Sequence, residues 1–344
     1  MVLSGYTMTA LIIRSLSGYM VDRFPRRMVL VLSYAFFCML FAGYLLAGTL
    51  LLFAIVRTLH GAPFGATTVS NSTVAIDVLP PSRRAEGIGF YGLSNNVATA
   101  ISPTVALLIY GACDNFQVLF WLAFITSAIG LALTASVKLP NRPIIRSTSR
   151  LSLDRFILLK GWSQGLSIIC FAFSYGILVT YIAIYGKEEL GITSGTGLFF
   201  ALLAIGLICS RLIGSRTLRI GKIVQNASVG IVIAMIGYLI FATIHNKVGY
   251  YGAALIIGLG NGLMFPAFQT MFINLADNSQ RGTANSTLLV SWDIGVGLGI
   301  LVGGIVAQHA GYSAAFWTAW GVNLVGVVIY NLFVRRHFLA NKLR

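Results

Sequence analysis

The chain has 344 residues, of which 57% are hydrophobic and 10% are charged, and its mean hydropathy is +0.85. Soluble domains carry about 25% charged residues, so this chain lacks the polar residues to cover a water-exposed surface and belongs in a lipid bilayer. A net charge of +15 can indicate nucleic acid binding, but here the Lys and Arg residues lie between apolar runs and no nucleic-acid-binding motif is present.

Eleven apolar runs are long enough to cross a bilayer, which takes about 20 residues. In chain order we predict membrane-spanning helices near 1–20, 28–47, 50–73, 87–111, 116–136, 161–186, 195–213, 224–244, 248–274, 284–308 and 313–334. The longest loop, residues 137–160, is basic and separates five spans from six. We therefore expect an all-α membrane protein with two helical bundles, residues 1–136 and 161–344, joined by a basic cytoplasmic linker.

The basic residues set the expected orientation. Nineteen of the 24 Lys and Arg residues lie in alternate loops and in the C-terminal tail, whereas the opposite loops hold only Lys187 and Lys247. Since cytoplasmic loops carry the excess of Lys and Arg, we expect an external N-terminus and a cytoplasmic C-terminus in the cell inner membrane. The chain enters its first span without a basic start, so a cleavable signal peptide is not expected.

A short basic hinge after the first span returns in the second half of the chain. Gly18-Tyr-Met-Val-Asp22-Arg23-Phe-Pro25-Arg26-Arg27 corresponds to Gly214-Ser-Arg-Thr-Leu218-Arg219-Ile-Gly221-Lys222, 196 residues later. Three further matches follow in the same order, namely His60 with Asn261, Arg84 with Arg281 and Asn96 with Asp293. Such an internal duplication is typical of secondary transporters.

At these motifs the chain resembles the major facilitator superfamily. The hinge of that family reads G-x-L-x-D-R-x-G-R-R, and here the matching residues are Gly18, Asp22, Arg23, Arg26 and Arg27, with Pro25 in place of a glycine. A family pattern of Arg followed four residues later by Gly occurs as Arg57 and Gly61. The resemblance covers the whole chain except one N-terminal helix, so we expect eleven of the family's twelve helices and the fold of two pseudo-symmetric bundles.

An efflux-type pattern of the family is present in degenerate form. Pro103 is kept, but the glycines around it are replaced by Ala, Ser and Leu, whereas the span at 284–308 has Gly295 and Gly299 without a proline. Small residues four apart allow close helix packing, and a proline bends its helix. The departures from the pattern weaken the expectation of efflux without removing it.

Four residues within the spans are candidates for a coupling site or a cavity. Asp293 lies near mid-membrane, where a carboxylate is costly and is a functional candidate by default; protonation would remove its charge. The resemblance implies that Arg57 holds or senses the coupling proton. His60 lies one turn further on, and Asn96 is the repeat mate of Asp293. The alternatives are a structural carboxylate at 293, an outward-reaching Arg57 and a packed, hydrogen-bonded His60.

The hinge residues are expected to act as a gate. The resemblance implies that Asp22 meets the N-terminal end of the helix at 284–308 and holds the two halves closed inside, where the positive helix end favours a negative charge. Asp77 could pair with Arg23 or Arg26. Gly214 and Arg219 form the second hinge, which has Leu218 in place of the acid. The alternative is a loop that only sets topology.

The resulting expectation is a monomeric secondary active transporter that exports a small organic molecule by alternating access, driven by protons or another ion. An uptake symporter or uniporter is one alternative, and a truncated, receptor-like or defective membrane protein is another. No nucleotide-binding fingerprint, metal spacing or nucleophile–base arrangement is visible, so we expect no enzyme, no metal and no cofactor.

Overall fold

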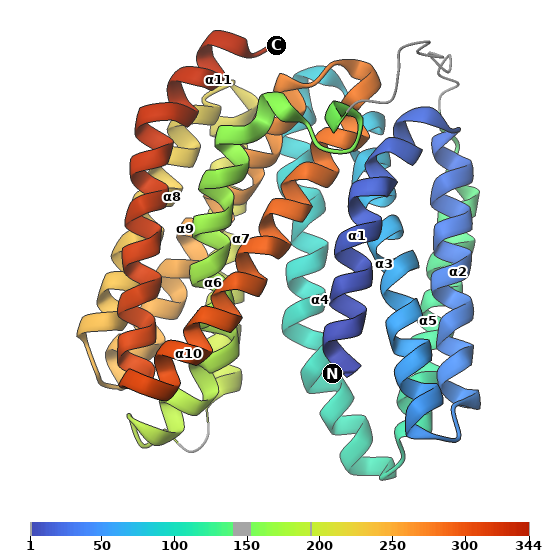
Figure 1. Ribbon diagram of the computed structural model, residues 1–344, viewed down its shortest axis with the longest axis horizontal. Helices are drawn as coiled ribbons and strands as arrows, with labels where there is room; N and C mark the ends of the chain where they lie inside the picture. Colours follow the sequence, from blue (N-terminus) through green and yellow to red (C-terminus); the bar gives the residue numbers. More distant parts are fainter. Residues whose placement is uncertain (1, 140–152, 193–194, 344) are drawn as a thin grey trace. The chain divides into compact units, whose positions relative to one another are not determined.

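A computed structural model describes residues 2–139, 153–192 and 195–343, and within these residues all regular structure is helical. The helices of the first part (Figure 1) are α1 (Val2–Arg23), α2 (Arg26–Leu46), α3 (Leu50–Val78), α4 (Arg84–Cys113) and α5 (Phe116–Ser136). They are followed by α6 (Trp162–Glu188), α7 (Thr196–Arg219), α8 (Ile223–Thr243), α9 (Lys247–Leu275), α10 (Arg281–Ile329) and α11 (Arg335–Asn341), with a π-helical turn at Tyr330–Val334 before α11.

The predicted spans agree with these helices. The two spans at 284–308 and 313–334 correspond to the two helical segments of α10, which are separated by a kink at Gly311, where φ is 85° and ψ is 165°. Figure 1 shows the second half of α10 running back from this kink. Eight described helices are long and apolar enough to cross a membrane, with Asn278–Asn341 counted once. This set is drawn from the described residues and does not include α1 or α4.

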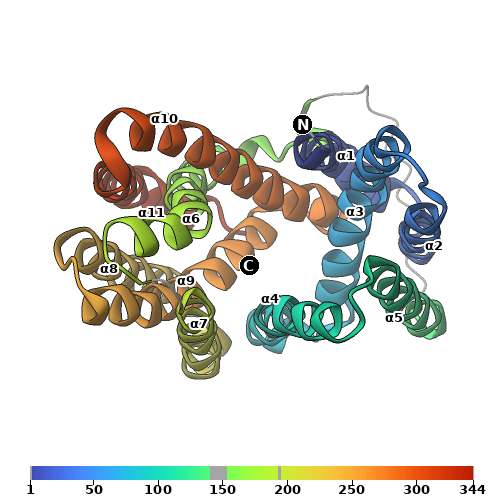
Figure 2. The ribbon, with the colours of Figure 1, turned by 90° about the horizontal axis from the view of Figure 1, so that it is seen from below.

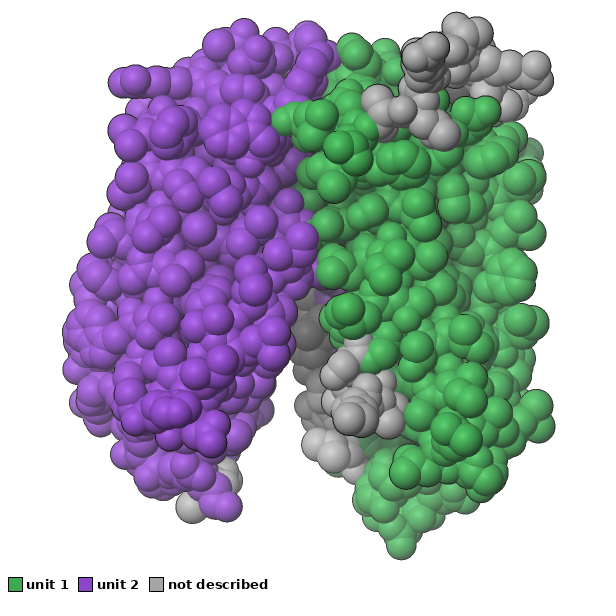
Figure 3. Space-filling model, viewed as in Figure 1, with its two compact units in different colours: residues 1–79, 101–159, 276–290 green, residues 80–100, 160–275, 291–344 purple. Residues whose placement is uncertain are grey.

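The described chain forms two compact units, coloured separately in Figure 3. Unit 1 comprises residues 1–79, 101–159 and 276–290, and unit 2 comprises residues 80–100, 160–275 and 291–344. Thus α4 and α10 each pass from one unit into the other. The sequence-based division at 136 and 161 remains a prediction, and residues 140–152 of the expected linker lie outside the described residues.

In unit 1, α3 packs against α1 and α2, and α2 packs against α5 (Figure 2). The close approach of α3 to α1 depends on two glycines four residues apart. A Cβ atom on Gly61 would collide with the backbone of Tyr6, and one on Gly65 would lie 2.6 Å from the carbonyl oxygen of Ala10. Small residues at this spacing let two helix backbones meet, so the Arg57–Gly61 pattern has a packing role.

In unit 2, α9 packs against α7 and α8 around an aromatic core. The largest buried rings of this core are Tyr185, Phe199, Phe241, Tyr250 and Phe316. The glycines of α10 lie against α6, because a Cβ on Gly295 would be 2.6 Å from the Cβ of Ala172, and one on Gly299 would be 2.8 Å from the carbonyl carbon of Phe173. Pro103 lies within α4, but its side chain is outside the described residues.

Candidate functional site: the Asp22 latch

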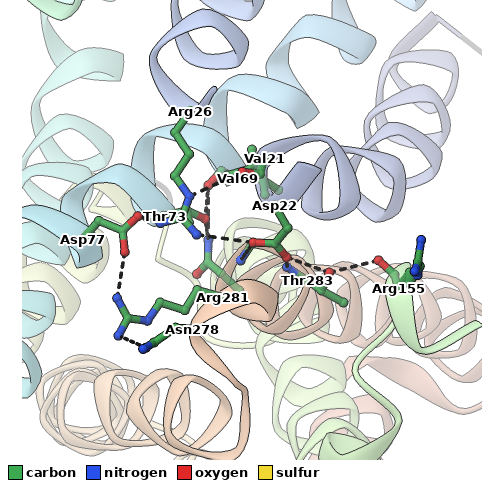
Figure 4. A network of polar contacts seen from close by, with 12 residues as sticks. Val21, Asp22, Arg26, Val69, Thr73, Asp77, Arg155, Asn278, Arg281 and Thr283 are labelled. Atoms are coloured by element: carbon green, nitrogen blue, oxygen red, sulfur yellow. Dashed lines mark hydrogen bonds and ion pairs between the residues drawn. The ribbon is translucent and has the colours of Figure 1, made fainter. Parts of the chain in front are cut away.

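Asp22, in the last turn of α1, binds the first turn of α10. Its Oδ1 accepts a hydrogen bond from the backbone N–H of Gly282 at 2.8 Å, and its Oδ2 accepts one from the backbone N–H of Thr283, also at 2.8 Å. The hydroxyl of Thr283 lies 2.9 Å from the same Oδ2 (Figure 4). The first N–H groups of a helix lack partners within the helix, and the carboxylate supplies them. We call this contact the Asp22 latch.

The latch is largely removed from water. The side chain of Asp22 is 9% exposed, and the residue lies beyond the predicted span 1–20. Burial raises the pKa of its carboxyl to about 6, while the donors of Thr283 and Gly282 and the charge of Arg26 act in the opposite direction. The carboxyl is therefore mainly ionised at neutral pH, which is the state that can accept all three hydrogen bonds.

A buried ion-pair cluster lies beside the latch. The guanidinium of Arg281 places Nη1 2.9 Å from Oδ1 of Asp77, and Arg26 pairs with Oδ2 of the same carboxylate. Arg26 also lies 3.5 Å from Asp22. The side chains of Asp77, Arg281 and Arg26 are 5%, 4% and 14% exposed, so the four charges neutralise one another away from solvent. The cluster joins the ends of α1, α2 and α3 to the start of α10.

Two glycines make room for the latch. A Cβ atom on Gly282 would lie 2.6 Å from the carbonyl oxygen of Gly18 and 2.9 Å from Oδ1 of Asp22. A Cβ atom on Gly18 would collide with the hydroxyl of Ser286 and would lie 3.0 Å from the carbonyl oxygen of Gly282. A side chain at either position would therefore separate α1 from α10 and lengthen the hydrogen bonds to Asp22.

Further polar contacts hold the start of α10 within unit 1. The amide of Asn285 donates to the hydroxyl of Ser72 at 2.6 Å, and the hydroxyl of Thr287 accepts the N–H of Leu158 at 2.8 Å. The single hydroxyl proton of Thr283 can be donated either to Oδ2 of Asp22 or to the carbonyl oxygen of Arg155, each of which lies 2.9 Å from the hydroxyl oxygen. The first two turns of α10 thus bind α3 and the segment before α6 as well as α1.

The other residues predicted for the hinge have separate surroundings. Arg23 donates to the hydroxyl of Tyr19 at 2.8 Å, and Arg27 donates to the carbonyl oxygen of Ala135 at the end of α5, at 2.7 Å. Gly214 and Arg219 belong to unit 2: Gly214 packs against Leu263 and Asn226, and Arg219 lines a groove that is described below.

His60 lies in a box of aromatic rings in unit 1. Its Nδ1 is 3.0 Å from the hydroxyl of Tyr44, and its ring is within 4.6 Å, centroid to centroid, of the rings of Phe37 and Phe41. Its Nε2 has no hydrogen-bond partner in the described part of the chain. Arg57 stacks over Tyr6, with 4.2 Å between the guanidinium carbon and the ring centroid. These contacts support the packed, structural interpretation of His60.

The coupling candidates are divided between the units. Arg57 and His60 belong to unit 1, whereas Asn96 and Asp293 belong to unit 2. Asp293 is half-buried on α10, next to Trp292, whose ring packs against Tyr175 and Phe265. The side chain of Asn96 is outside the described residues. Among the described residues, no group of three or more His, Cys, Asp or Glu side chains could hold a metal ion.

Sequence reasoning missed the partners that α10 contributes. The sequence marks Arg281 as a basic loop residue and as the repeat mate of Arg84, but it does not indicate that Arg281 pairs with Asp77 or that Gly282 and Thr283 bind Asp22. The internal repeat could have directed attention to these residues, because Arg281 and Gly282 correspond to Arg84 and Ala85 at the start of α4.

The described helices form two compact units, and the basic hinge after α1 binds the start of the distant helix α10. This combination is typical of a class of membrane transporters. The profile of the Major Facilitator Superfamily matches residues 1–287 and 255–343. The chain therefore belongs to the Major Facilitator Superfamily of transporters.

Two named relatives have low sequence identity to this chain but align with it over most of their length. The chain is 22% identical over 334 residues to the staphylopine export protein of Staphylococcus aureus, covering 90% of this chain and 81% of that protein. It is 25% identical to the uncharacterized MFS-type transporter YtbD of Bacillus subtilis, covering 79% and 70% of the two chains.

Solved structures share the fold. The human organic anion transporter MFSD10 (TETRAN) has a TM-score of 0.80 at 17% identity, covering 95% of this chain and 82% of that one. The E. coli Fucose:proton symporter, FucP, has a TM-score of 0.80 at 15% identity, covering 96% and 89%. At these identities the likeness concerns the fold alone.

Proposed function

We propose that the protein is a proton-driven exporter of a small organic molecule that works by alternating access. The observation that carries the proposal is the Asp22 latch, which binds the start of α10 to unit 1, while the rest of α10 belongs to unit 2. A helix shared in this way couples any movement of unit 2 to the latch. A hinge that only sets topology would need its arginines. It would not need a buried acid such as Asp22, or glycines at 18 and 282 that let α1 and α10 approach each other.

The direction of transport is inferred from a relative. The staphylopine export protein is named as an exporter, and the similarity extends over 81% of its length. The excess of Lys and Arg in alternate loops supports a cytoplasmic C-terminus in the cell inner membrane. In that orientation the latch is on the cytoplasmic side of the membrane. Its release opens the protein to the cytoplasm, where an exporter binds its substrate.

The latch can be released because its free energy is modest. Hydrogen bonds to a charged group contribute about 1.5–3 kcal/mol each, and a conformational equilibrium needs about 5.5 kcal/mol to shift from 1:99 to 99:1. Substrate binding together with proton transfer can supply a difference of this size. Asp293, the acid within the membrane part of α10, is the residue that we assign to proton transfer.

A flux experiment with two probes tests the proposal. The chain is reconstituted in proteoliposomes, and an imposed proton gradient is combined with staphylopine or with fucose as the probe. Gradient-driven movement of staphylopine against the proton flow supports export. Movement of fucose together with protons would favour the uptake symporter, the second candidate, which the fold it shares with FucP keeps open. Flux of either probe without dependence on the gradient would contradict proton coupling.

A further inference from the structure

A basic groove in unit 2 is not used by the proposed transport cycle. It has a volume of about 890 Å³ and is formed by the start of α4, the hinge between α7 and α8, the end of α9, and α11. Five cationic side chains line it, and no acidic residue does; the cations are Arg84, Arg219, Lys222, Arg335 and Lys342. Glu86, the acid nearest to this region in sequence, pairs with Arg83 at 3.0 Å.

The groove is amphipathic. Its floor includes the buried side chains of Leu218, Ile223 and Phe338, whereas Arg219, Lys222, Arg335 and Lys342 are exposed around it. The N–H of Leu343 donates to the carbonyl oxygen of Asn274 at 2.8 Å, and this bond fixes the C-terminal segment, with Lys342, against the end of α9. Cations above an apolar floor match a ligand that has an anionic head and a hydrocarbon body.

The internal repeat shows why the groove occurs in unit 2. In unit 1 the hinge acid Asp22 occupies the start of α10. The residue of the second hinge that corresponds to Asp22 is Leu218. The residues that correspond to the start of α10 are Arg84 and Ala85, at the start of α4. Leu218, Arg84 and Ala85 all line the groove. Leucine cannot accept a hydrogen bond, so the second hinge lacks the buried carboxylate of the first. Glu86 acts electrostatically on Arg219, but no acidic residue lines the groove itself, so its cations can bind an external anion.

We propose that this groove binds the phosphate headgroup of an anionic phospholipid, with the acyl chains along the apolar floor. The predicted orientation places the groove at the cytoplasmic leaflet, which is rich in anionic lipids and attracts basic segments next to the membrane. None of the lining residues belongs to the Asp22 latch or to the coupling candidates. Leu218 and Arg219 belong to the second hinge, so lipid binding is measured separately from transport.

Binding of phosphatidylglycerol to the purified chain in neutral detergent, measured by native mass spectrometry, tests this site. The double variant Arg219→Gln with Lys222→Gln is expected to lose about tenfold or more in affinity, since each surface cation contributes about 1 kcal/mol. The matched control is Arg216→Gln with Arg336→Gln, which removes the same charge from exposed residues that do not line the groove. It should keep wild-type binding. Equal losses in both variants would overturn the site.

Two further binding measurements distinguish a lipid phosphate from a free phosphate ion and test the role of Leu218 in the second hinge. Phosphatidylcholine should bind weakly, and inorganic phosphate at millimolar concentration should not displace the lipid; displacement by phosphate would overturn the lipid assignment in favour of a soluble anion. Leu218→Asp, which restores the hinge acid, should lower phosphatidylglycerol binding. Undiminished lipid binding by folded Leu218→Asp would contradict the comparison with Asp22.

Discussion

Arg281 and Asp77 are 204 residues apart in the sequence, and Nη1 of the arginine lies 2.9 Å from Oδ1 of the aspartate. Both side chains are almost fully removed from solvent, at 4% and 5% exposure. Such a pair is a weak source of net stability, because desolvation offsets most of the attraction. Its significance is positional: the guanidinium is on the first residue of α10, so the pair fixes where that helix begins relative to α3.

Asp77→Asn is expected to destabilise the protein strongly. The change leaves Arg26 and Arg281 buried without their shared counterion, and breaking a buried pair costs about 3–5 kcal/mol. Thermal unfolding in detergent measures the loss. The control is Asp277→Asn, which changes an exposed acid just before α10 and should leave unfolding nearly unchanged. Similar unfolding curves for the two variants would show that the Asp77 cluster is not structurally important.

Asp22→Asn is expected to impair transport while expression stays close to wild type. An amide keeps one acceptor oxygen but turns its NH2 group toward a backbone N–H, so at least one charge-assisted bond is lost, at a cost of about 1.5–3 kcal/mol. The same flux assay gives the result. Asp114→Asn is the control, since Asp114 is exposed and has a φ of 47°, which asparagine tolerates. Wild-type flux in Asp22→Asn would reduce the hinge to a topology signal.

Gly18→Ala is expected to weaken the latch through steric pressure alone. The new methyl group collides with the hydroxyl of Ser286, and overpacking of this kind costs about 1–3 kcal/mol. Ser286→Gly in the same chain should restore part of the loss, because it removes the colliding side chain. Gly111→Ala, in α4 with no atom near its added Cβ, should be tolerated. Thermal unfolding and flux are compared for all variants; no rescue by Ser286→Gly would contradict the packing argument.

The helices could be predicted from the sequence because hydrophobic runs of about 20 residues determine them locally. The contact of Asp22 with the start of α10 was an expectation from family resemblance, since no local pattern relates residues 22 and 282. Arg281 shows the limit: the sequence marks it as basic and as the mate of Arg84, but its counterion depends on how α3 and α10 pack. His60 shows another limit, because His60 is on α3 while the rings around it come from helices α1 and α2.

The predicted topology is open to a direct test. A chain with its four cysteines replaced is the background, since Cys113 and Cys209 are exposed. Lys187→Cys should then react with an impermeant maleimide from outside the cell, and Lys138→Cys only after the membrane is permeabilised. Both positions are exposed in the structure, so failure to react reflects the side of the membrane. Reversed reactivity would contradict the orientation inferred from Lys and Arg.

Asp293→Asn is expected to abolish gradient-driven flux and to preserve substrate binding. The aspartate is the acid within the membrane part of α10, while its repeat mate Asn96 cannot titrate; one half of the duplicated chain therefore has an ionisable group that the other lacks. An asparagine keeps the size and polarity of the side chain and removes only its proton exchange, so coupling and binding are separated. The control is Asp277→Asn, an exposed acid just before α10, which should behave as wild type. Equilibrium binding of whichever probe the wild-type chain transports is measured beside proton-driven flux in proteoliposomes. Normal gradient dependence in Asp293→Asn would move the coupling role to Arg57, whose guanidinium stacks on Tyr6 in unit 1.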